Sequence, residues 1–138
     1  MVSFLNLIAG LALALGLSLS SPLACADSPL KGPMKSMGGG FFALQQGIND
    51  VSQYPALEGT VQGMIADAKT AQTMIPAMAL GKPLETEAYN AQMSALITTL
   101  SQLETALKAK DSAQALSLLK QVNTQKIQGH TRFKPKQD

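Results

Sequence analysis

The chain has 138 residues, of which 46% are hydrophobic and only 14% are charged, and its formal net charge is +2. This small charge, with no basic stripe interleaved with aromatic residues, argues against a nucleic-acid partner. Cys25 is the only cysteine. A disulfide, a thiolate nucleophile and a covalent haem attachment of the Cys-x-x-Cys-His kind are therefore excluded for any mature chain that begins after it.

The first 26 residues have the pattern of a secretory signal peptide. They contain no Lys, Arg, Asp or Glu, and an apolar run extends from Leu7 to Leu19. Ala24-Cys25-Ala26 then supplies the small residues that signal peptidase requires. We expect residues 1–26 to be cleaved before Asp27. This leaves one exported domain, residues 27–138, with no stable membrane insertion.

Two other interpretations of this segment stay open. A retained membrane helix needs about 20 apolar residues, and the run is shorter than that before it reaches Ser18, Ser20, Ser21 and Pro22. A lipoprotein would use Cys25 as its lipidated first residue, although Pro22 stands where such sites usually have Leu.

Four segments of the mature chain have the period of an amphipathic helix, with apolar residues spaced mostly four and three apart. No segment alternates with a period of two. The four expected stripes are Leu30, Met34, Met37, Phe41, Leu44, Ile48 and Val51; Leu57, Val61, Met64, Ala68, Ala71, Ile75 and Met78; Tyr89, Met93, Leu96, Leu100, Leu103 and Leu107; and Ala115, Leu116, Leu119, Val122, Ile127, His130 and Phe133.

Prolines and short connections define the expected topology. Pro33 fits only in a first helical turn, Pro76 and Pro83 bound a loop over residues 77–83, and Asp111 or Ser112 can cap the last helix. The short connections at 52–56 and 109–111 force neighbouring helices to run antiparallel, which predicts an all-α, up-down-up-down four-helix bundle. The start of the first helix and the end of the fourth then lie at the same end.

The mature chain resembles the soluble cytochrome b562 family, periplasmic four-helix bundles that bind one haem b without covalent attachment. The resemblance covers nearly all of residues 27–138 and rests on the order and spacing of several pieces. These pieces are Met34-x-x-Met37, Met64-Ile65-Ala66-Asp67-Ala68-Lys69 before Pro76, Leu103-Glu104-Thr105-Ala106-Leu107-Lys108, and His130-x-x-Phe133.

The resemblance implies a b-type cytochrome that transfers electrons, with Met34 as the sixth and His130 as the fifth ligand of one haem iron. Met37 is the alternative to Met34. A thioether stabilises ferrous iron, and an imidazole completes a site suited to electron transfer. An apolar slot is also implied, with side chains that could line it drawn from Phe41, Phe42, Met64, Ile75, Tyr89, Met93 and Ile127. The cations available for the haem propionates are Lys126, Arg132 and Lys35.

The sequence departs from the family pattern in two places: Gly129 stands before His130 where an aromatic residue is expected, and Gly38 to Gly40 weaken the first helix. Two alternatives therefore stay open, a haem-free bundle that binds a partner or responds to envelope stress, and a Cu(I) site built from Met34, Met37 and His130. We do not expect an enzyme, because no nucleophile has a base beside it in the sequence. A redox partner protein is implied but not identified, and the chain is expected to be a monomer or a weak dimer.

Overall fold

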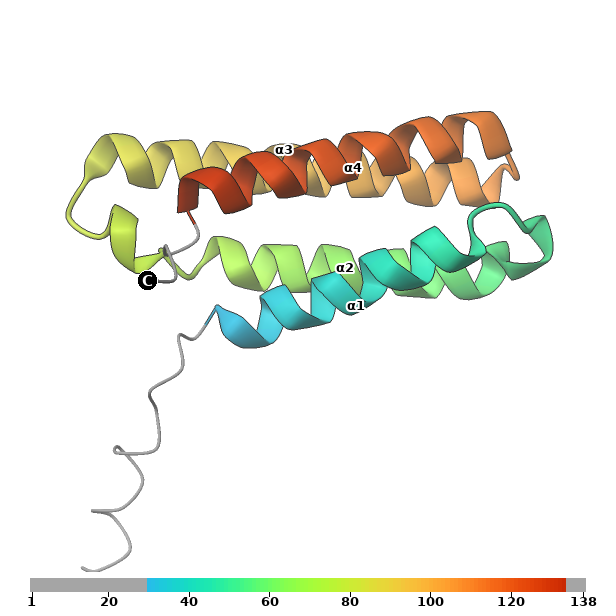
Figure 1. Cartoon of the computed structure of the whole chain (residues 1–138), viewed down its shortest axis with the longest axis horizontal. Coiled ribbons are helices and arrows are strands. Elements are labelled where there is room, and N and C mark those ends of the chain that lie inside the picture. The colour runs from blue at the N-terminus through green and yellow to red at the C-terminus, as the bar shows by residue number, and fades with distance from the viewer. Residues whose placement is uncertain (1–29, 134–138) are drawn as a thin grey trace, which may run out of the picture.

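The computed structural model describes residues 30–133, which form a bundle of four helices (Figure 1). The helices are α1 (Lys31–Gly47), α2 (Tyr54–Gln72), α3 (Pro83–Lys108) and α4 (Ser112–Phe133). Two short 3-10 turns, η2 (Val51–Gln53) and η3 (Ala77–Ala79), precede α2 and α3. The expected all-α four-helix fold is confirmed. The signal peptide, Cys25 and the cleavage point before Asp27 lie outside the described residues.

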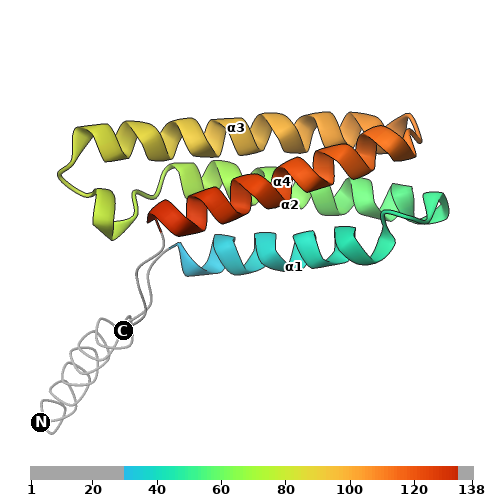
Figure 2. The same cartoon turned by 45° about the horizontal axis from the view of Figure 1, so that its top comes forward.

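Side-chain contacts show that neighbouring helices run in opposite directions, because residue numbers rise along one helix as they fall along the next. The pairs are Gly40 with Met64 and Gly47 with Leu57 between α1 and α2; Gln62 with Glu104 and Gln72 with Asn90 between α2 and α3; and Gln125 with Thr99 and Arg132 with Glu85 between α3 and α4. The start of α1 and the end of α4 consequently lie at the same end (Figures 1 and 2).

The helix ends follow the local signals in the sequence. Pro55 and Pro83 stand in the first turns of α2 and α3, where a missing N–H costs no hydrogen bond. Asp111 caps α4 by accepting a hydrogen bond from the backbone N–H of Gln114 at 3.1 Å. None of the helices in residues 30–133 is long and apolar enough to cross a membrane.

The second helix is shorter than its predicted stripe. It ends at Gln72, and Pro76 holds an extended conformation (φ −63°, ψ 147°) before η3. Since a proline disfavours helix in the residue before it, the chain leaves the helix early. Ile75 and Met78, which the periodicity assigned to the core, are exposed as a result, and so is Val51 in η2.

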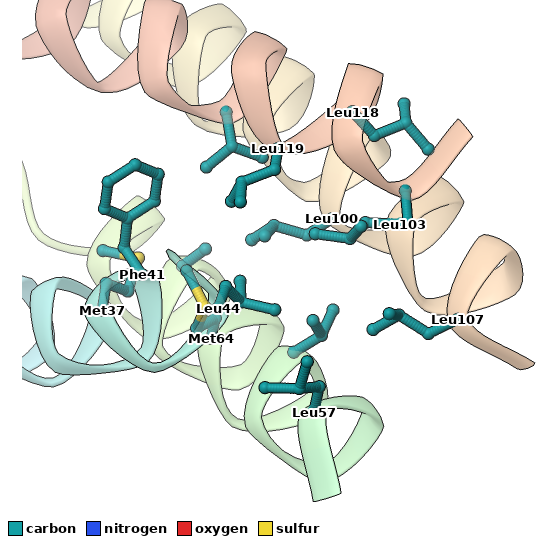
Figure 3. Close-up of a cluster of buried hydrophobic side chains, with 14 of the residues drawn as sticks. Met37, Phe41, Leu44, Leu57, Met64, Leu100, Leu103, Leu107, Leu118 and Leu119 are labelled. Atoms are coloured by element: carbon teal, nitrogen blue, oxygen red, sulfur yellow. The ribbon is translucent and has the colours of Figure 1, made fainter. Parts of the chain in front are cut away.

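The core is a continuous apolar cluster to which all four helices contribute (Figure 3). Gly40 of α1 packs directly against Met64 of α2: a Cβ atom at Gly40 would lie only 2.6 Å from Met64 Cγ and 2.8 Å from its Sδ. A Cβ at Gly38 or Gly39 would meet nothing within 4 Å. The weak glycine turn therefore allows close packing at one position only.

Candidate functional site

The first and fourth helices are neighbours that pack together loosely. Backbone contacts are extensive between α1 and α2, α2 and α3, and α3 and α4, but sparse between α1 and α4. A side-chain contact joins this last pair: the Lys126 ammonium of α4 lies 4.1 Å from the ring centroid of Phe41 in α1. We call the facing sides of these two helices the α1–α4 seam and define it by Met34, Phe41, Lys126 and His130.

Helix geometry places Met34 on the seam side of α1. Met34 precedes Phe41 by seven residues, so the two project within about 20° of each other and about 10 Å apart along the axis. Its backbone N–H donates to the Leu30 carbonyl at 3.0 Å, and its side chain is half-buried against the edge of the core. Met37, with 8% of its surface exposed, is a core residue. Met34 is thus the more accessible of the two thioethers beside Phe41, and Met37 is the more buried.

His130 follows Lys126 by four residues, which places it on nearly the same side of α4 and about 6 Å further toward the end of the bundle. Moving from the Phe41–Lys126 contact toward that end, the chain thus brings a thioether from α1 and an imidazole from α4 to the same seam. These are the two ligand types of a six-coordinate haem iron.

The prediction that His130 lies on the buried stripe of the last helix is wrong, because its side chain is exposed. The inward line of α4 instead runs through Val122, Lys126, Gly129 and Phe133, at spacings of four, three and four. Because Lys126 and Gly129 are not apolar, the apolar periodicity assigned the neighbouring Ile127 and His130 to the core instead. Successive helical residues are rotated by about 100°, so His130 lies at the rim of the seam while Gly129 before it faces the core.

Leu116 and Ile127 were also expected in the core, and the structure contradicts this. Both side chains are exposed, whereas Leu118 is buried between α4 and its neighbours. Phe42, which was considered for the lining of a haem slot, is exposed as well.

Ile75 is exposed too, and the remaining four predicted lining residues, Phe41, Met64, Tyr89 and Met93, are buried. Phe41 and Met64 are buried, and Met37 lies with them in one cluster (Figure 3). Tyr89 and Met93 are buried in the first half of α3, toward the end of the bundle where α1 begins and α4 ends. The Tyr89 ring packs edge-on against Phe133 with centroids 5.4 Å apart, and its hydroxyl donates to the Ala71 carbonyl. Burial raises the pKa of Tyr89 to about 12, so it stays a neutral hydrogen-bond donor.

Two of the three predicted cations, Lys126 and Arg132, lie on different sides of α4. Lys126 is part-buried at the seam over Phe41. Arg132 turns toward α3, where its Nε and Nη2 donate to the two carboxylate oxygens of Glu85 at 3.1 and 3.0 Å. These hydrogen bonds hold the pKa of Glu85 below its ordinary value. The structure therefore brings Lys126, and not Arg132, to the seam.

A polar contact between α3 and α4 carried no recognisable signal in the sequence. The side-chain amide of Gln92 donates to the backbone carbonyl of Gln125 at 3.0 Å. The side-chain amide of Gln125 donates to the hydroxyl of buried Thr99, also at 3.0 Å. Gly129 leaves room beside Gln92, since a Cβ there would stand 3.8 Å from Gln92 Cγ. An isolated glutamine in a helical pattern has no property that distinguishes an interhelical contact from an exposed position.

The residues at the seam fit a haem in ligand type and in surroundings. Met34 is half-buried beside the seam and His130 is exposed at its rim. Phe41 and Met37 supply apolar surface, and Lys126 supplies one cation. The Lys126–Phe41 contact spans the seam, so a planar ligand would displace it. Among residues 30–133 there is no group of three or more His, Cys, Asp or Glu that could hold a metal.

The fold and the seam define a class, the up-and-down four-helix bundles with ligating side chains on facing helices. The Cytochrome b562 family model matches residues 29–134, which is most of the chain. The chain belongs to the cytochrome b562 family. Comparison with curated proteins and with solved structures gives no significant match. The family points to a haem-binding electron-transfer bundle rather than to an enzyme.

Proposed function

We propose that this protein is a periplasmic b-type cytochrome that binds one haem b per chain without covalent attachment and transfers single electrons. The observation that carries the proposal is the Lys126–Phe41 contact. It shows that Phe41 of α1 and Lys126 of α4 face each other, and the helical spacing of Met34 from Phe41 and of His130 from Lys126 supports the assignment of these two residues as ligands. Periplasmic localisation is proposed from the signal-like pattern of residues 1–26.

In this proposal the Met34 thioether of α1 and the His130 imidazole of α4 are the residues that would hold the iron. When bound, the haem would supply the one-electron redox chemistry, with a potential raised by the thioether ligand. Phe41 and the core behind it would keep water away from one face of the haem. Lys126 would neutralise a propionate carboxylate, and Met64 lies in the core as support for α1.

The test is an absorption spectrum of the protein titrated with hemin, recorded oxidised and after dithionite reduction. Sharp reduced α and β bands with a one-to-one endpoint are expected. His130→Ala should lose most of the haem affinity, because an axial ligand worth several kcal/mol is removed and its site is left open. An unchanged Soret band in His130→Ala would overturn the axial assignment.

A further inference from the structure

The exposed apolar side chains of the bundle are concentrated in one short segment. Among the large apolar residues that the structure leaves exposed, four fall between residues 75 and 84, where α2 connects to α3. Their exposed fractions are 40% for Ile75, 38% for Met78, 61% for Leu80 and 79% for Leu84. We call these four side chains, with Lys82 among them, the connection patch. These four side chains lie within ten residues of one connection, and exposed apolar side chains gathered in this way are candidates for an interaction site.

The connection patch is held in a fixed shape by its backbone. Ala79 is fully buried and anchors η3 to the bundle, and its carbonyl accepts from Lys82 N–H at 3.0 Å and from the Thr86 hydroxyl at 3.1 Å. Gly81 makes the turn with φ +73°, a conformation that favours glycine. Because the segment is already ordered, a partner would lose little conformational entropy in binding it.

The connection patch lies at the same end of the molecule as the start of α1 and the end of α4 (Figures 1 and 2). Met34 in the first turn of α1 and His130 in the last turn of α4 lie at this same end. A hollow of about 480 Å³, lined by Gly81, Lys82, Pro83, Thr86, Glu87 and Asn90, opens beside it. A protein docked here would approach the iron proposed above from the nearer end of the bundle.

The charges at this end indicate the partner. Counted over residues 30–133, the half of the bundle nearest the connection patch has six basic and three acidic side chains. They are Lys31, Lys35, Lys69, Lys82, Lys126 and Arg132, against Asp67, Glu85 and Glu87. One of these acids, Glu85, is already paired with Arg132. The opposite half has three basic and four acidic side chains, so the two ends of the molecule differ in sign.

We infer that the connection patch is the docking surface for an electron-transfer protein that presents apolar side chains surrounded by carboxylates. The inference rests on the proposed function. Apolar contacts from Leu80 and Leu84 hold the partner, and Lys82 with the other lysines of this end steers its approach. The reaction in the complex transfers one electron from the ferrous iron to the partner's oxidised centre, and no bond or proton is exchanged.

The experiment uses the reduced haem protein and plastocyanin, an acidic blue-copper protein, as the probe, with the oxidation rate followed by stopped-flow. Leu80→Ser/Leu84→Ser should slow oxidation by plastocyanin about fivefold to tenfold, because two apolar contacts are lost, and should leave oxidation by ferricyanide unchanged. Lys82→Glu should slow oxidation by plastocyanin and weaken its dependence on salt. Val51→Ser, at an exposed apolar residue of the opposite end, is the control.

Equal plastocyanin rates for the double variant and Val51→Ser would overturn the inference. So would a wild-type dimer in sedimentation that becomes a monomer in Leu80→Ser/Leu84→Ser, because the occupant would then be a second copy of the chain. If the protein binds no haem, the proposed function fails, and the docking surface is tested separately. Amide NMR shifts of residues 75–84 on addition of Cu(I)-plastocyanin should then still move, and unmoved shifts would overturn the inference.

Discussion

At the scale of single residues, Lys126 contacts the Phe41 ring in the structure and would have a haem propionate as a second partner in the proposed cytochrome. Its ammonium over the Phe41 ring is a cation–π contact worth about 0.5–2 kcal/mol. A bound haem would offer it a carboxylate, which is the stronger partner for an ammonium in a part-buried place. The same side chain thus closes the seam without haem and would hold the cofactor with it.

Replacement of Lys126 by Met separates these roles, because Met keeps most of the apolar stem and lacks the charge. We expect the haem affinity to fall about tenfold, which is about 1.4 kcal/mol, and Lys126→Arg to restore it. Hemin titration at the Soret band measures both, and Lys120→Met at an exposed position of α4 is the control. Tighter haem binding by Lys126→Met would show that the ammonium only closes the seam.

Met34 and Met37 also differ at this scale, since one borders the seam and the other is buried in the core. Met37→Ala should cost about 2–5 kcal/mol of unfolding free energy through the cavity that it leaves, with the six-coordinate spectrum retained. Met34→Ala should instead change the spectrum to a five-coordinate or water-ligated form at a smaller cost in stability. Urea unfolding and absorption spectra measure the two effects, and the reverse pattern would assign the ligand to Met37.

At the scale of the elements, α1 depends on the absence of a side chain at one of its three consecutive glycines. Only Gly40 touches α2, where Met64 occupies the space of a Cβ. Alanine is the better helix former by about 0.8–1 kcal/mol wherever space allows it. Replacement by alanine should therefore lower the stability at Gly40 and raise it at Gly38 and Gly39.

Gly40→Ala should destabilise the bundle by roughly 1–3 kcal/mol through overpacking. Gly39→Ala, where a Cβ would meet nothing within 4 Å, should stabilise it by about 0.4–1 kcal/mol. Chemical denaturation followed by circular dichroism gives both values. A neutral Gly40→Ala would mean that Met64 moves aside without cost and that the close contact has no energetic role.

The elements were largely predictable from the sequence because apolar periodicity, prolines and the Asp111 cap all indicate helices directly. The site was less predictable. The pattern placed Met34, Phe41 and Lys126 on suitable helices, yet it put His130 and Ile127 in the core, because the true inward positions in α4 are Lys126 and Gly129. Arg132 was assigned to the cofactor, but its pairing with Glu85 depends on α3, and local spacing contains no information on that contact.

At the scale of the whole molecule, the bundle is held by three extensive helix pairs and one sparse one. A ligand that joins α1 to α4 would complete the fourth pair. Since a ligand that binds only the folded state stabilises it by mass action, haem at about a hundred times its Kd should add about 2.7 kcal/mol.

We therefore expect haem to raise the melting temperature by roughly 10–20 °C at that concentration, given about 4–8 °C per kcal/mol for a domain of this size. Melting curves by circular dichroism with and without hemin measure the shift. His130→Ala melted with the same hemin is the control and should show little of it. An equal shift in that variant would indicate haem adsorption elsewhere on the bundle.

The two ends of the described chain lie together, and this has a consequence for how the bundle assembles. Three of its helix pairs are hairpins between sequence neighbours, whereas the α1–α4 pair joins segments that are nearly a whole domain apart. That pair has the largest loop-closure entropy and should form last. A circular permutant that links the end of α4 to the start of α1 and opens the chain at the α3–α4 turn would make the seam a local hairpin, so the slot for the cofactor would be shaped early in folding rather than at its end.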